Sequence, residues 1–377
     1  MLDVEQEKRI IKVLLINTVA TDRNGITGVL FNYLRNMKSD AFQLDLLSLN
    51  NPNQSYICEV KNRGGEVYVL PRLDGIIRYM KELISLIKRN KYQVVHIHGN
   101  SHTVILELVS AWIAGCKIRI VHSHNTTCSI PLIHRILTPI FNLFYTHGIA
   151  CGKEAGYWMF GRKPFTVFNN GVNTDIFAFN KRTRDLYRQE LGVQEENILV
   201  GHVGLFNEQK NHSFLIKVFR ELYNKDRRYR LLLIGDGELR PMIAELVNEL
   251  GLKNAVCFTG SIPNVADYLN AIDLILMPSL YEGLPLALVE QQANGLKCIV
   301  SDAISKEADK TGNMLFLSLN NPAEKWAKTV LNLNTVSRDD ASKQSIEKIK
   351  RVGYCIQNEA RRLEDYYMGA YKKTYKK

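Results

Sequence analysis

Two glutamates, Glu282 and Glu290, lie eight positions apart in the stretch YEGLPLALVEQ. The stretch follows the apolar run Leu274–Met277, which we expect to be a β-strand, and a helical pattern begins at Leu286. In an α/β domain, ligands bind beyond the carboxyl ends of the strands. Glu282 is therefore predicted at a loop tip beside a ligand. Glu290 is predicted inside the helix, where a carboxylate can accept hydrogen bonds from the vicinal hydroxyls of a ribose. The alternative is that the spacing of the two glutamates has no function, because a glutamate on a helix is usually a solvated surface residue.

The loop between the two glutamates is suited to an anionic ligand. Gly283 allows the backbone to come close to a ligand, because glycine has no Cβ. Pro285 suits the first helical position, since its missing N–H would be unpaired there in any case. The backbone amides that follow would face the ligand from a helix N-terminus, where the helix dipole favours negative charge.

Short apolar runs alternate with helical patterns along the chain, which is typical of parallel β-sheets covered by helices on both faces. The runs expected to be strands are Ile10–Asn17, Gln43–Leu49, Glu66–Leu70, Gln93–His98, Ile118–Ser123, Ile149–Cys151, Thr166–Phe168, Ile198–Val203, Arg230–Ile234, Val256–Phe258, Leu274–Met277 and Cys298–Val300. A cluster of Gly and Asn at Phe168–Phe177 separates two series of strands. The predicted fold class is α/β, with two Rossmann-like doubly wound domains facing each other across a cleft. A single TIM barrel is the main alternative, because it has the same alternation.

The composition narrows the class of protein. At 377 residues the chain has the length of two domains, and seven cysteines without a C-x-x-C pair indicate reduced thiols. The first residues are charged, and no apolar run of about 20 residues occurs. We therefore expect neither a signal peptide nor a membrane span, and a cytoplasmic location.

The net charge of +11 fits an anionic partner. Nucleotide phosphates, nucleic acid and an acidic membrane surface all have the right sign, but no arginine-rich run or aromatic-plus-basic pattern indicates nucleic acid. The terminal YKKTYKK is suited to peripheral contact with an anionic membrane at its inner face.

Several motifs, in order along the chain, resemble those of the retaining GT-B glycosyltransferases of family 4, which move a sugar from a nucleotide donor to an acceptor hydroxyl. The densest match is MPSLYEGLPLALVEQQANGLKCIVSD. The others are GITGV, RIVHSHN, FNNGVN, GHVGLFNEQKNHSFLIKVF, LLLIGDGELR and FTGSIPNVADYLNAIDLILMPS. The resemblance covers nearly the whole chain, more loosely before position 118, and is closest to the branch that builds bacterial capsule and exopolysaccharide. It implies the GT-B fold and a UDP-sugar donor.

The resemblance also implies a role for each part of the chain. Residues 1–170 would form an N-terminal, acceptor-side Rossmann-like domain, and residues 171–352 a C-terminal domain that binds the nucleotide-sugar. Residues 353–377 would form a C-terminal helix that packs back on the N-terminal domain. The implied acceptor is a lipid-linked oligosaccharide.

In that family the second glutamate of the E-x7-E pair holds the donor ribose, a role that falls on Glu290. The first glutamate lies beside the transferred sugar, which implies Glu282, with the backbone amides of Gly283 and Leu284 nearby. A lysine that contacts the donor diphosphate matches Lys210. Its ammonium would neutralise the charge that grows on the leaving group as the glycosidic bond breaks.

Other implied site residues lie outside the E-x7-E stretch. Asn207 stands in the same motif as the lysine and is a further donor-binding candidate. His122 matches a family histidine that faces the donor sugar, and Gly25 lies in a loop that the family uses near the donor phosphates and the acceptor. For His122, a core histidine bonded to the backbone is the alternative. One departure is Leu205, which stands where the family has an arginine, so a second cationic contact to the phosphates is missing there.

The pairs His96–His98 and His122–His124 support an alternative from another class. A TIM-barrel hydrolase presents two imidazoles to zinc with this H-x-H spacing. That hypothesis needs further histidines and an aspartate at later strand ends, and only His202 and His212 follow His147. NAD binding is disfavoured because RNGITGV is not a G-x-G-x-x-G motif and no acidic ribose ligand follows at the usual spacing.

No D-x-D motif stands in a loop suited to holding a divalent cation on the diphosphate, so we expect metal-independent transfer without a cofactor. Lys210 and helix-terminal amides would stabilise the negative charge instead. The resemblance implies retention by a front-face route, in which the departing phosphate oxygen takes the proton of the acceptor. A UDP-sugar 2-epimerase is one alternative with this fold, and a non-catalytic nucleotide-sugar-binding protein, motivated by Leu205, is another.

Overall fold

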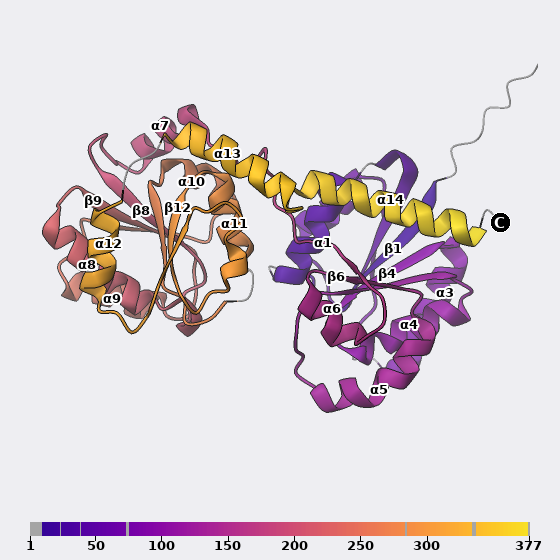
Figure 1. The fold of residues 1–377 in the computed structure, drawn as a ribbon. Helices are drawn as coiled ribbons and strands as arrows, with labels where there is room; N and C mark the ends of the chain where they lie inside the picture. The colour runs from indigo at the N-terminus through magenta and orange to yellow at the C-terminus, as the bar shows by residue number, and fades with distance from the viewer. Residues whose placement is uncertain are drawn as a thin grey trace, which may run out of the picture. The chain divides into compact units, whose positions relative to one another are not determined.

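The computed structural model describes residues 10–22, 24–37, 39–72, 75–282, 285–333 and 337–375. The chain divides into two compact units, Met1–Gly171 together with Ile356–Lys377 (unit 1) and Val172–Cys355 (unit 2). Each unit has one parallel sheet with helices on both of its faces (Figure 1).

The sheet of unit 1 has the strand order β3-β2-β1-β4-β5-β6-β7. Its strands are β1 (Ile11–Asn17), β2 (Phe42–Ser48), β3 (Val67–Val69), β4 (Val94–Gly99), β5 (Ile118–Ser123), β6 (His147–Ala150) and β7 (Thr166–Val167). Its helices are α1 (Gly25–Asn36), α2 (Gln54–Asn62), α3 (Ile76–Asn90), α4 (Ile105–Ile113), α5 (Pro131–Phe144), α6 (Lys153–Phe160) and α14 (Ile356–Tyr375), with short 3-10 turns at Ser39–Ala41 and His102–Val104. The central strands are buried on both faces and read as continuous apolar runs for that reason.

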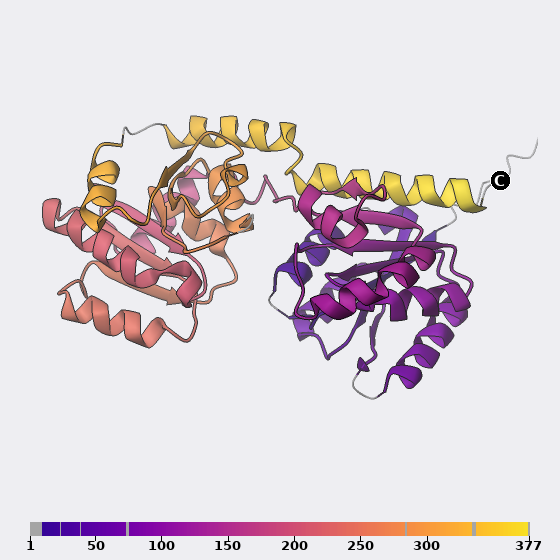
Figure 2. The same ribbon diagram turned by 60° about the horizontal axis from the view of Figure 1, so that its bottom comes forward.

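The last helix, α14, completes unit 1 although it is far from the rest of the unit in sequence. With α1 it covers one face of the sheet, whereas α3, α4 and α5 cover the other (Figure 1), and α14 runs along unit 1 in both views (Figures 1 and 2). Tyr367 is fully buried on this helix; its ring lies edge-on to Phe42, and its hydroxyl is hydrogen-bonded to Nδ1 of His96. This apolar and polar contact attaches α14 to β2 and β4.

The sheet of unit 2 has the strand order β10-β9-β8-β11-β12-β13. Its strands are β8 (Ile198–Val203), β9 (Tyr229–Ile234), β10 (Val256–Gly260), β11 (Leu274–Met277), β12 (Lys297–Ser301) and β13 (Met314–Leu317). Its helices are α7 (Lys181–Glu190), α8 (His212–Lys225), α9 (Arg240–Glu249), α10 (Val265–Ala271), α11 (Leu286–Ala293), α12 (Ala323–Leu331) and α13 (Arg338–Arg351), with 3-10 turns η4 (Glu208–Lys210) and η5 (Lys306–Ala308).

Successive residues of these strands point to opposite faces and enter two separate cores. Val200 and Leu231 pack with the α8, α9 and α12 side, where Trp326 is buried. Leu199 and Leu232 pack with the α10 and α11 side. Each strand is therefore apolar at nearly every position, because helices cover both faces of the sheet.

The predicted fold class is confirmed, since two doubly wound parallel sheets are present. The alternative hypothesis of a single TIM barrel was wrong. Two details differ from the sequence-based expectations. The strand β13 was missed, because it has only four residues, MLFL, and lies at the edge of the sheet. Pro285 occupies the N-cap of α11 in an extended conformation, rather than the first helical position. Among the described residues, no helix is both long enough and apolar enough to cross a lipid bilayer.

The buried contact of α14 predicts a stability effect. Tyr367→Ala should lower the unfolding free energy by about 3–5 kcal/mol, because it leaves a cavity beneath the helix. Tyr367→Phe should cost only about 1 kcal/mol, since it removes the hydrogen bond and keeps the ring. Urea unfolding checks both values, with the exposed Tyr157→Ala as the control. Equal midpoints for Tyr367→Ala and Tyr157→Ala would show that α14 adds little to the stability of unit 1.

Candidate functional site

The candidate site of unit 2 lies between two neighbouring strands, β8 and β11, from which the chain adds its next strands on opposite sides of the sheet. From β8 the chain continues to β9 and β10, whereas β11, beside β8, continues to β12 and β13. The pairing of these two central strands runs from Leu274 and Val200 to Ile275 and Gly201 and ends there. A crevice at such a switch point is where open α/β sheets bind their ligands.

His202 occupies the position where the pairing of β8 and β11 ends. Its Nδ1 donates a hydrogen bond to the carbonyl oxygen of Leu276, 2.8 Å away, and the ring is fully buried. Burial lowers the pKa of His202 to about 3, so the imidazole is neutral. Nε2 is buried and has no partner among the described residues. His202 therefore replaces the missing strand-to-strand hydrogen bond without adding charge.

An ion pair joins the loops that follow β8 and β11. The ammonium of Lys210, at the end of η4, contacts a carboxylate oxygen of Glu282, and the two side chains are only 14% and 9% exposed. Asn207 caps η4, because its side-chain oxygen accepts a hydrogen bond from the Lys210 backbone N–H at 3.2 Å. Three predicted site residues, Asn207, Lys210 and Glu282, thus meet on one side of the switch point.

Backbone hydrogen bonds support this ion pair. The N–H of Leu280 donates to the carbonyl of Gln209 at 2.8 Å, and the Gln209 side chain donates to the carbonyl of Tyr281 at 2.9 Å. On the other side, Glu282 forms an isolated parallel bridge with Ile304, in the loop that follows β12. The loop that carries Glu282 is therefore connected to both of its neighbours.

The loop after β9 is packed against the loop after β8. Gly235 and Gly237 have φ angles of +138° and +155°, which other residues rarely adopt. A Cβ on Gly235 would lie 2.0 Å from the carbonyl oxygen of Gly204, and one on Gly237 would lie 2.6 Å from that of Phe206. The G-D-G of LLLIGDGELR is therefore a close approach of two backbones that keeps the Lys210 loop in place.

Glu290 lies on α11, the helix that follows the Glu282 loop. Its carboxylate has no hydrogen-bond or ion-pair partner among the described residues, and burial raises its pKa from the usual 4.5 to about 7. Pro285 makes no side-chain cap hydrogen bond, so the first amides of α11 have no capping side chain. Gly283 and Leu284, the other predicted donor-binding residues, lie outside the described residues.

Aromatic rings next to Lys210 were not predicted as part of the site. His212 stacks on Phe206 with ring centroids 4.1 Å apart and lies edge-on to His202 at 4.7 Å. Burial, and secondarily Lys210, lower the pKa of His212 to about 4. These uncharged aromatic rings therefore pack next to the ammonium of Lys210. The segments GHVGLF and KNH contain these rings in the sequence. Sequence reasoning missed them because the spacing of their histidines matches no metal-binding or catalytic motif.

Position 205, where the family arginine is missing, holds an exposed leucine. The Leu205 side chain is 64% exposed. Arg240, the first basic residue after β9 in the sequence, pairs with Asp236 at 3.8 Å. The departure from the family motif noted in the sequence is therefore an exposed apolar side chain in the structure.

In unit 1 the corresponding switch point lies between β1 and β4. Gly25 is the first residue of α1, after β1, and Asn24 caps the helix by accepting a hydrogen bond from the Thr27 N–H. His122 lies within β5 and is buried, and both of its ring nitrogens lack a partner among the described residues. Its ring stacks on that of His124 at 4.1 Å. His122 is therefore covered by His124 within its own unit.

Three histidines of β4 and β5, together with His124 directly after β5, form one stacked cluster. The ring nitrogens of His96, His98 and His122 lie within 4.8 Å of one another, so three imidazoles that could hold a metal ion meet here. His98 is also hydrogen-bonded to His124 at 2.9 Å, and burial lowers the pKa of all four rings. The H-x-H pairs thus lie together on one sheet, although the barrel that the zinc hypothesis required is absent from both units.

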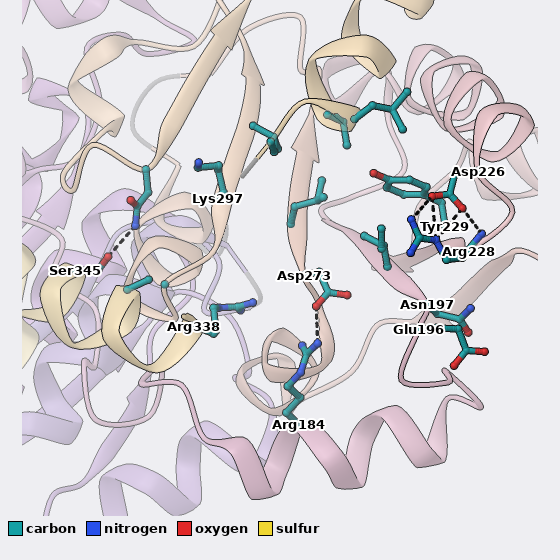
Figure 3. A pocket seen from close by; sticks show the side chains of 18 of the residues that line it. Arg184, Glu196, Asn197, Asp226, Arg228, Tyr229, Asp273, Lys297, Arg338 and Ser345 are labelled. Atoms are coloured by element: carbon teal, nitrogen blue, oxygen red, sulfur yellow. Dashed lines mark hydrogen bonds and ion pairs between the residues drawn. The ribbon is translucent and has the colours of Figure 1, made fainter. Parts of the chain in front are cut away.

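A cavity of about 770 Å³ opens at the amino ends of the unit 2 strands (Figure 3), whereas Lys210 follows the carboxyl end of β8. Its charged side chains include two ion pairs, Arg184 with Asp273 at 2.5 Å and Arg228 with Asp226 at 2.7 Å. Arg338 donates to backbone carbonyls, including that of Ile272. The arginines here hold helix ends and strand starts together, and no predicted site residue lines the cavity.

Residues 183–333 match the model of the family described as glycosyl transferases group 1. The putative glycosyltransferase EpsF of Bacillus subtilis is 31% identical, in an alignment that covers 96% of this chain and 96% of that protein. An Escherichia coli protein, UDP-Gal:alpha-D-GlcNAc-diphosphoundecaprenol alpha-1,3-galactosyltransferase, is 28% identical, with 74% of this chain and 76% of that protein covered. The capsular polysaccharide biosynthesis glycosyltransferase CapH of Staphylococcus aureus is 26% identical, with 76% and 83% covered.

The fold also matches solved structures. HepE of Anabaena, solved in complex with UDP, superposes with a TM-score of 0.75 at 18% identity, over 95% of this chain and 100% of that one. The likeness extends over both units and shows that the fold is GT-B. With this fold and with a relative that matches over almost its whole length, the chain belongs to the group 1 glycosyltransferases, in the branch that contains the capsule and exopolysaccharide enzymes.

Proposed function

We propose that this protein transfers a sugar from a UDP-sugar to a hydroxyl of a lipid-linked acceptor during the synthesis of a capsule, exopolysaccharide or other surface glycan. The observation that carries the proposal is the Lys210–Glu282 ion pair at the switch point of unit 2. It places a buried cation and a carboxylate where α/β sheets bind nucleotides.

The proposed donor rests on what related proteins bind. HepE has been solved with UDP and also with UDP-glucose. The E. coli relative is named for UDP-Gal. In unit 2, a diphosphate would find the ammonium of Lys210 and the uncapped amides of α11, which both favour negative charge.

Each site residue has a distinct proposed role. Lys210 stabilises the charge that develops on the leaving diphosphate, and its pairing with Glu282 holds the ammonium in position before the donor arrives. Glu282 lies beside the transferred sugar, and Glu290 accepts hydrogen bonds from the ribose hydroxyls. The backbone amides of Gly283 and Leu284 are assigned to the donor from the family motif, as are Asn207 and, in unit 1, Gly25 and His122.

The proposed transfer retains the configuration of the donor sugar. In a front-face route, the bond between the anomeric carbon and the diphosphate oxygen breaks, and the acceptor oxygen attacks from the same face. The departing phosphate oxygen takes the proton of the acceptor, so no enzyme nucleophile is needed. The charge that grows on the phosphate is met by Lys210 and the α11 amides, without a metal ion.

The proposed acceptor is a lipid-linked oligosaccharide. The name of the E. coli relative specifies a sugar on diphosphoundecaprenol. A second candidate function, nucleotide-sugar binding without turnover, is favoured by Leu205, which removes one cation from the family motif. Release of UDP that requires an acceptor separates transfer from both this function and epimerisation of the donor.

Glu290 predicts a pH-dependent UDP affinity. The ribose hydroxyls donate to the ionised carboxylate, so affinity should rise as the pH rises through about 7, the pKa of Glu290 in the free protein. Glu290→Gln should weaken binding at pH 8 by about 1.5–3 kcal/mol, which is roughly 10- to 150-fold in Kd.

Titration calorimetry between pH 6 and 8 measures both effects, and the exposed Glu245→Gln is the control. The β-phosphate of UDP also titrates in this range, so the relevant quantity is the difference between wild type and Glu290→Gln. If the two proteins have equal affinities at every pH, Glu290 does not hold the ribose.

Glu282→Gln is predicted to act on turnover rather than on nucleotide binding. The amide keeps the shape of the side chain but removes the charge that positions Lys210 and faces the sugar. We expect kcat to fall at least about ten-fold, with the Kd for UDP changed less than about three-fold. Initial rates with a UDP-sugar and an undecaprenyl-diphosphate-linked sugar test this, with Lys217→Ala, on the exposed face of α8, as the control. An unchanged kcat would remove Glu282 from the reaction.

Metal-independent transfer predicts that a chelator leaves the rate unaltered. EDTA at millimolar concentration should change the initial rate by less than about two-fold, because Lys210 and backbone amides stabilise the diphosphate. Metal analysis of the purified protein accompanies the assay, because His96, His98 and His122 lie close enough together to bind an ion. A strict requirement for manganese would overturn the proposed mechanism.

A further inference from the structure

The histidines of β4 and β5 project from one face of the unit 1 sheet. His98 and His122 are paired residues of these neighbouring strands, and His96 precedes His98 by two positions, so the three side chains point the same way. This is the face that α1 and α14 cover (Figure 1), because the His96 ring is bonded to Tyr367 of α14. The pairing of two strands therefore brings three imidazoles together without help from a loop.

Several ring nitrogens of this cluster are buried without a hydrogen-bond partner among the described residues. They are Nε2 of His96, Nδ1 of His124 and both ring nitrogens of His122. The His96 and His122 side chains are each only 1% exposed. A buried polar atom without a partner costs roughly 1–3 kcal/mol. Several such atoms in one place indicate that a ligand satisfies them.

The hydrogen bonds that the cluster does make favour one arrangement of protons. Nδ1 of His96 is bonded to the Tyr367 hydroxyl, and Nδ1 of His98 is bonded to Nε2 of His124 at 2.9 Å. With its proton on Nδ1, each ring donates in that bond and keeps the lone pair of Nε2 for a ligand. A histidine that binds a metal ion usually donates from its other nitrogen in this way. Tyr367 and His124 thus lie where groups that orient metal-binding rings are found.

The distances between the rings suit a metal ion. One nitrogen from each of His96, His98 and His122 lies within 4.8 Å of the other two. Zn–N bonds of about 2.0–2.1 Å in a tetrahedral site place the nitrogens roughly 3.4 Å apart. Rotations of the three side chains can close this difference while the strands stay in place. Three imidazoles leave the fourth tetrahedral position open for a water molecule.

The chemistry of the donor atoms selects the ligand. Imidazole nitrogen suits Zn²⁺, Cu²⁺ and Ni²⁺, whereas Mg²⁺, Ca²⁺ and Mn²⁺ prefer oxygen. An anion is not favoured, because burial lowers the pKa of the four rings and leaves them uncharged. His124, directly after β5, is only partly buried, so an ion can enter past it at the carboxyl edge of the sheet.

We propose that His96, His98 and His122 bind one Zn²⁺ ion, with Tyr367 and His124 orienting the rings of His96 and His98. The ion links β4 to β5 and, through Tyr367, to α14. All three ligands are neutral, so the ion keeps its full charge in a buried place, and we expect micromolar rather than nanomolar affinity.

The site shares one residue with the proposed function. An ion on His122 competes with the donor-sugar role proposed for that side chain, so zinc should inhibit transfer rather than assist it. At micromolar affinity the ion is lost on dilution into an assay, and the expected effect of a chelator is unchanged. Zinc binding is measured without donor or acceptor, so the two proposals can fail separately.

Zinc titration of the full chain tests the proposal. The protein is produced without a histidine tag, treated with EDTA, dialysed and titrated with ZnCl₂ in a calorimeter. The wild type should bind one Zn²⁺ per chain with a Kd of about 1–10 μM. His98→Asn should weaken binding at least about ten-fold, because it removes one of three ligands. The matched control His147→Asn changes a partly buried histidine of β6, outside the cluster, and should bind like the wild type.

Tyr367→Phe tests the same site without removing a ligand. The ring stays in place, but the oxygen that accepts from Nδ1 of His96 is lost, so zinc affinity should fall roughly 10- to 100-fold. Co²⁺ in place of zinc gives visible absorption bands that report tetrahedral coordination. These bands should appear in the wild type and His147→Asn, and should be lost in His98→Asn.

The outcomes separate a built site from chance binding. Absence of zinc binding by the wild type, or equal affinities of the wild type, His98→Asn and Tyr367→Phe, would overturn the proposal. An equal loss in His147→Asn would also overturn it, since binding would then be adventitious. If circular dichroism shows that His98→Asn is unfolded, Tyr367→Phe and the Co²⁺ spectrum of the wild type decide. Weaker binding in His98→Asn alone would support the ion and remove the positioning role of Tyr367.

Discussion

The ion pair between Lys210 and Glu282 joins two loops whose strands lead to opposite sides of the sheet, and the arrangement of unit 2 around its site depends on this pairing. A lysine and a glutamate that are mostly removed from water would be costly alone, because each charge loses hydration. Together they hold a cation at the carboxyl edge of the sheet. The neighbouring rings of His202 and His212 are uncharged, because burial lowers their pKa values. These two side chains therefore add no second positive charge beside the Lys210 ammonium.

Glu290 shows how burial prepares a group for a ligand. Without a partner, its carboxylate is destabilised in its charged form, which is why its pKa rises to about 7. Hydroxyls that donate to it would return the pKa toward the normal value, and this gain adds to the affinity of the ligand. The start of α11 has the complementary property, because Pro285 offers no capping side chain to its first amides, which are hydrogen-bond donors. The same short helix thus presents both donors and an acceptor.

The two units use their surfaces differently. In unit 2, the polar groups gather at the carboxyl edge of the sheet, and the arginines at the opposite edge are paired with carboxylates or carbonyls. In unit 1, four histidines stack on one another, with His96 bonded to α14 and His122 beside Tyr33 of α1, whereas α5 in the other layer exposes large apolar side chains. Burial lowers the pKa of these histidines, so the positive charge of unit 1 is carried by lysine and arginine.

The sequence by itself determined the fold class and most strands, because parallel strands buried on both faces must be apolar at nearly every position. The resemblance of two local motifs to the family also made Lys210, Glu282 and Glu290 candidate site residues. Only the tertiary structure decided that Lys210 and Glu282, 72 residues apart, form an ion pair, since this depends on which strands are neighbours. The burial that raises the pKa of Glu290, the place of His202 and the exposure of the outer face of α5 were decided in the same way. An apolar helix reads alike in sequence whether its second face is covered or open, because periodicity records side-chain type and not what lies opposite.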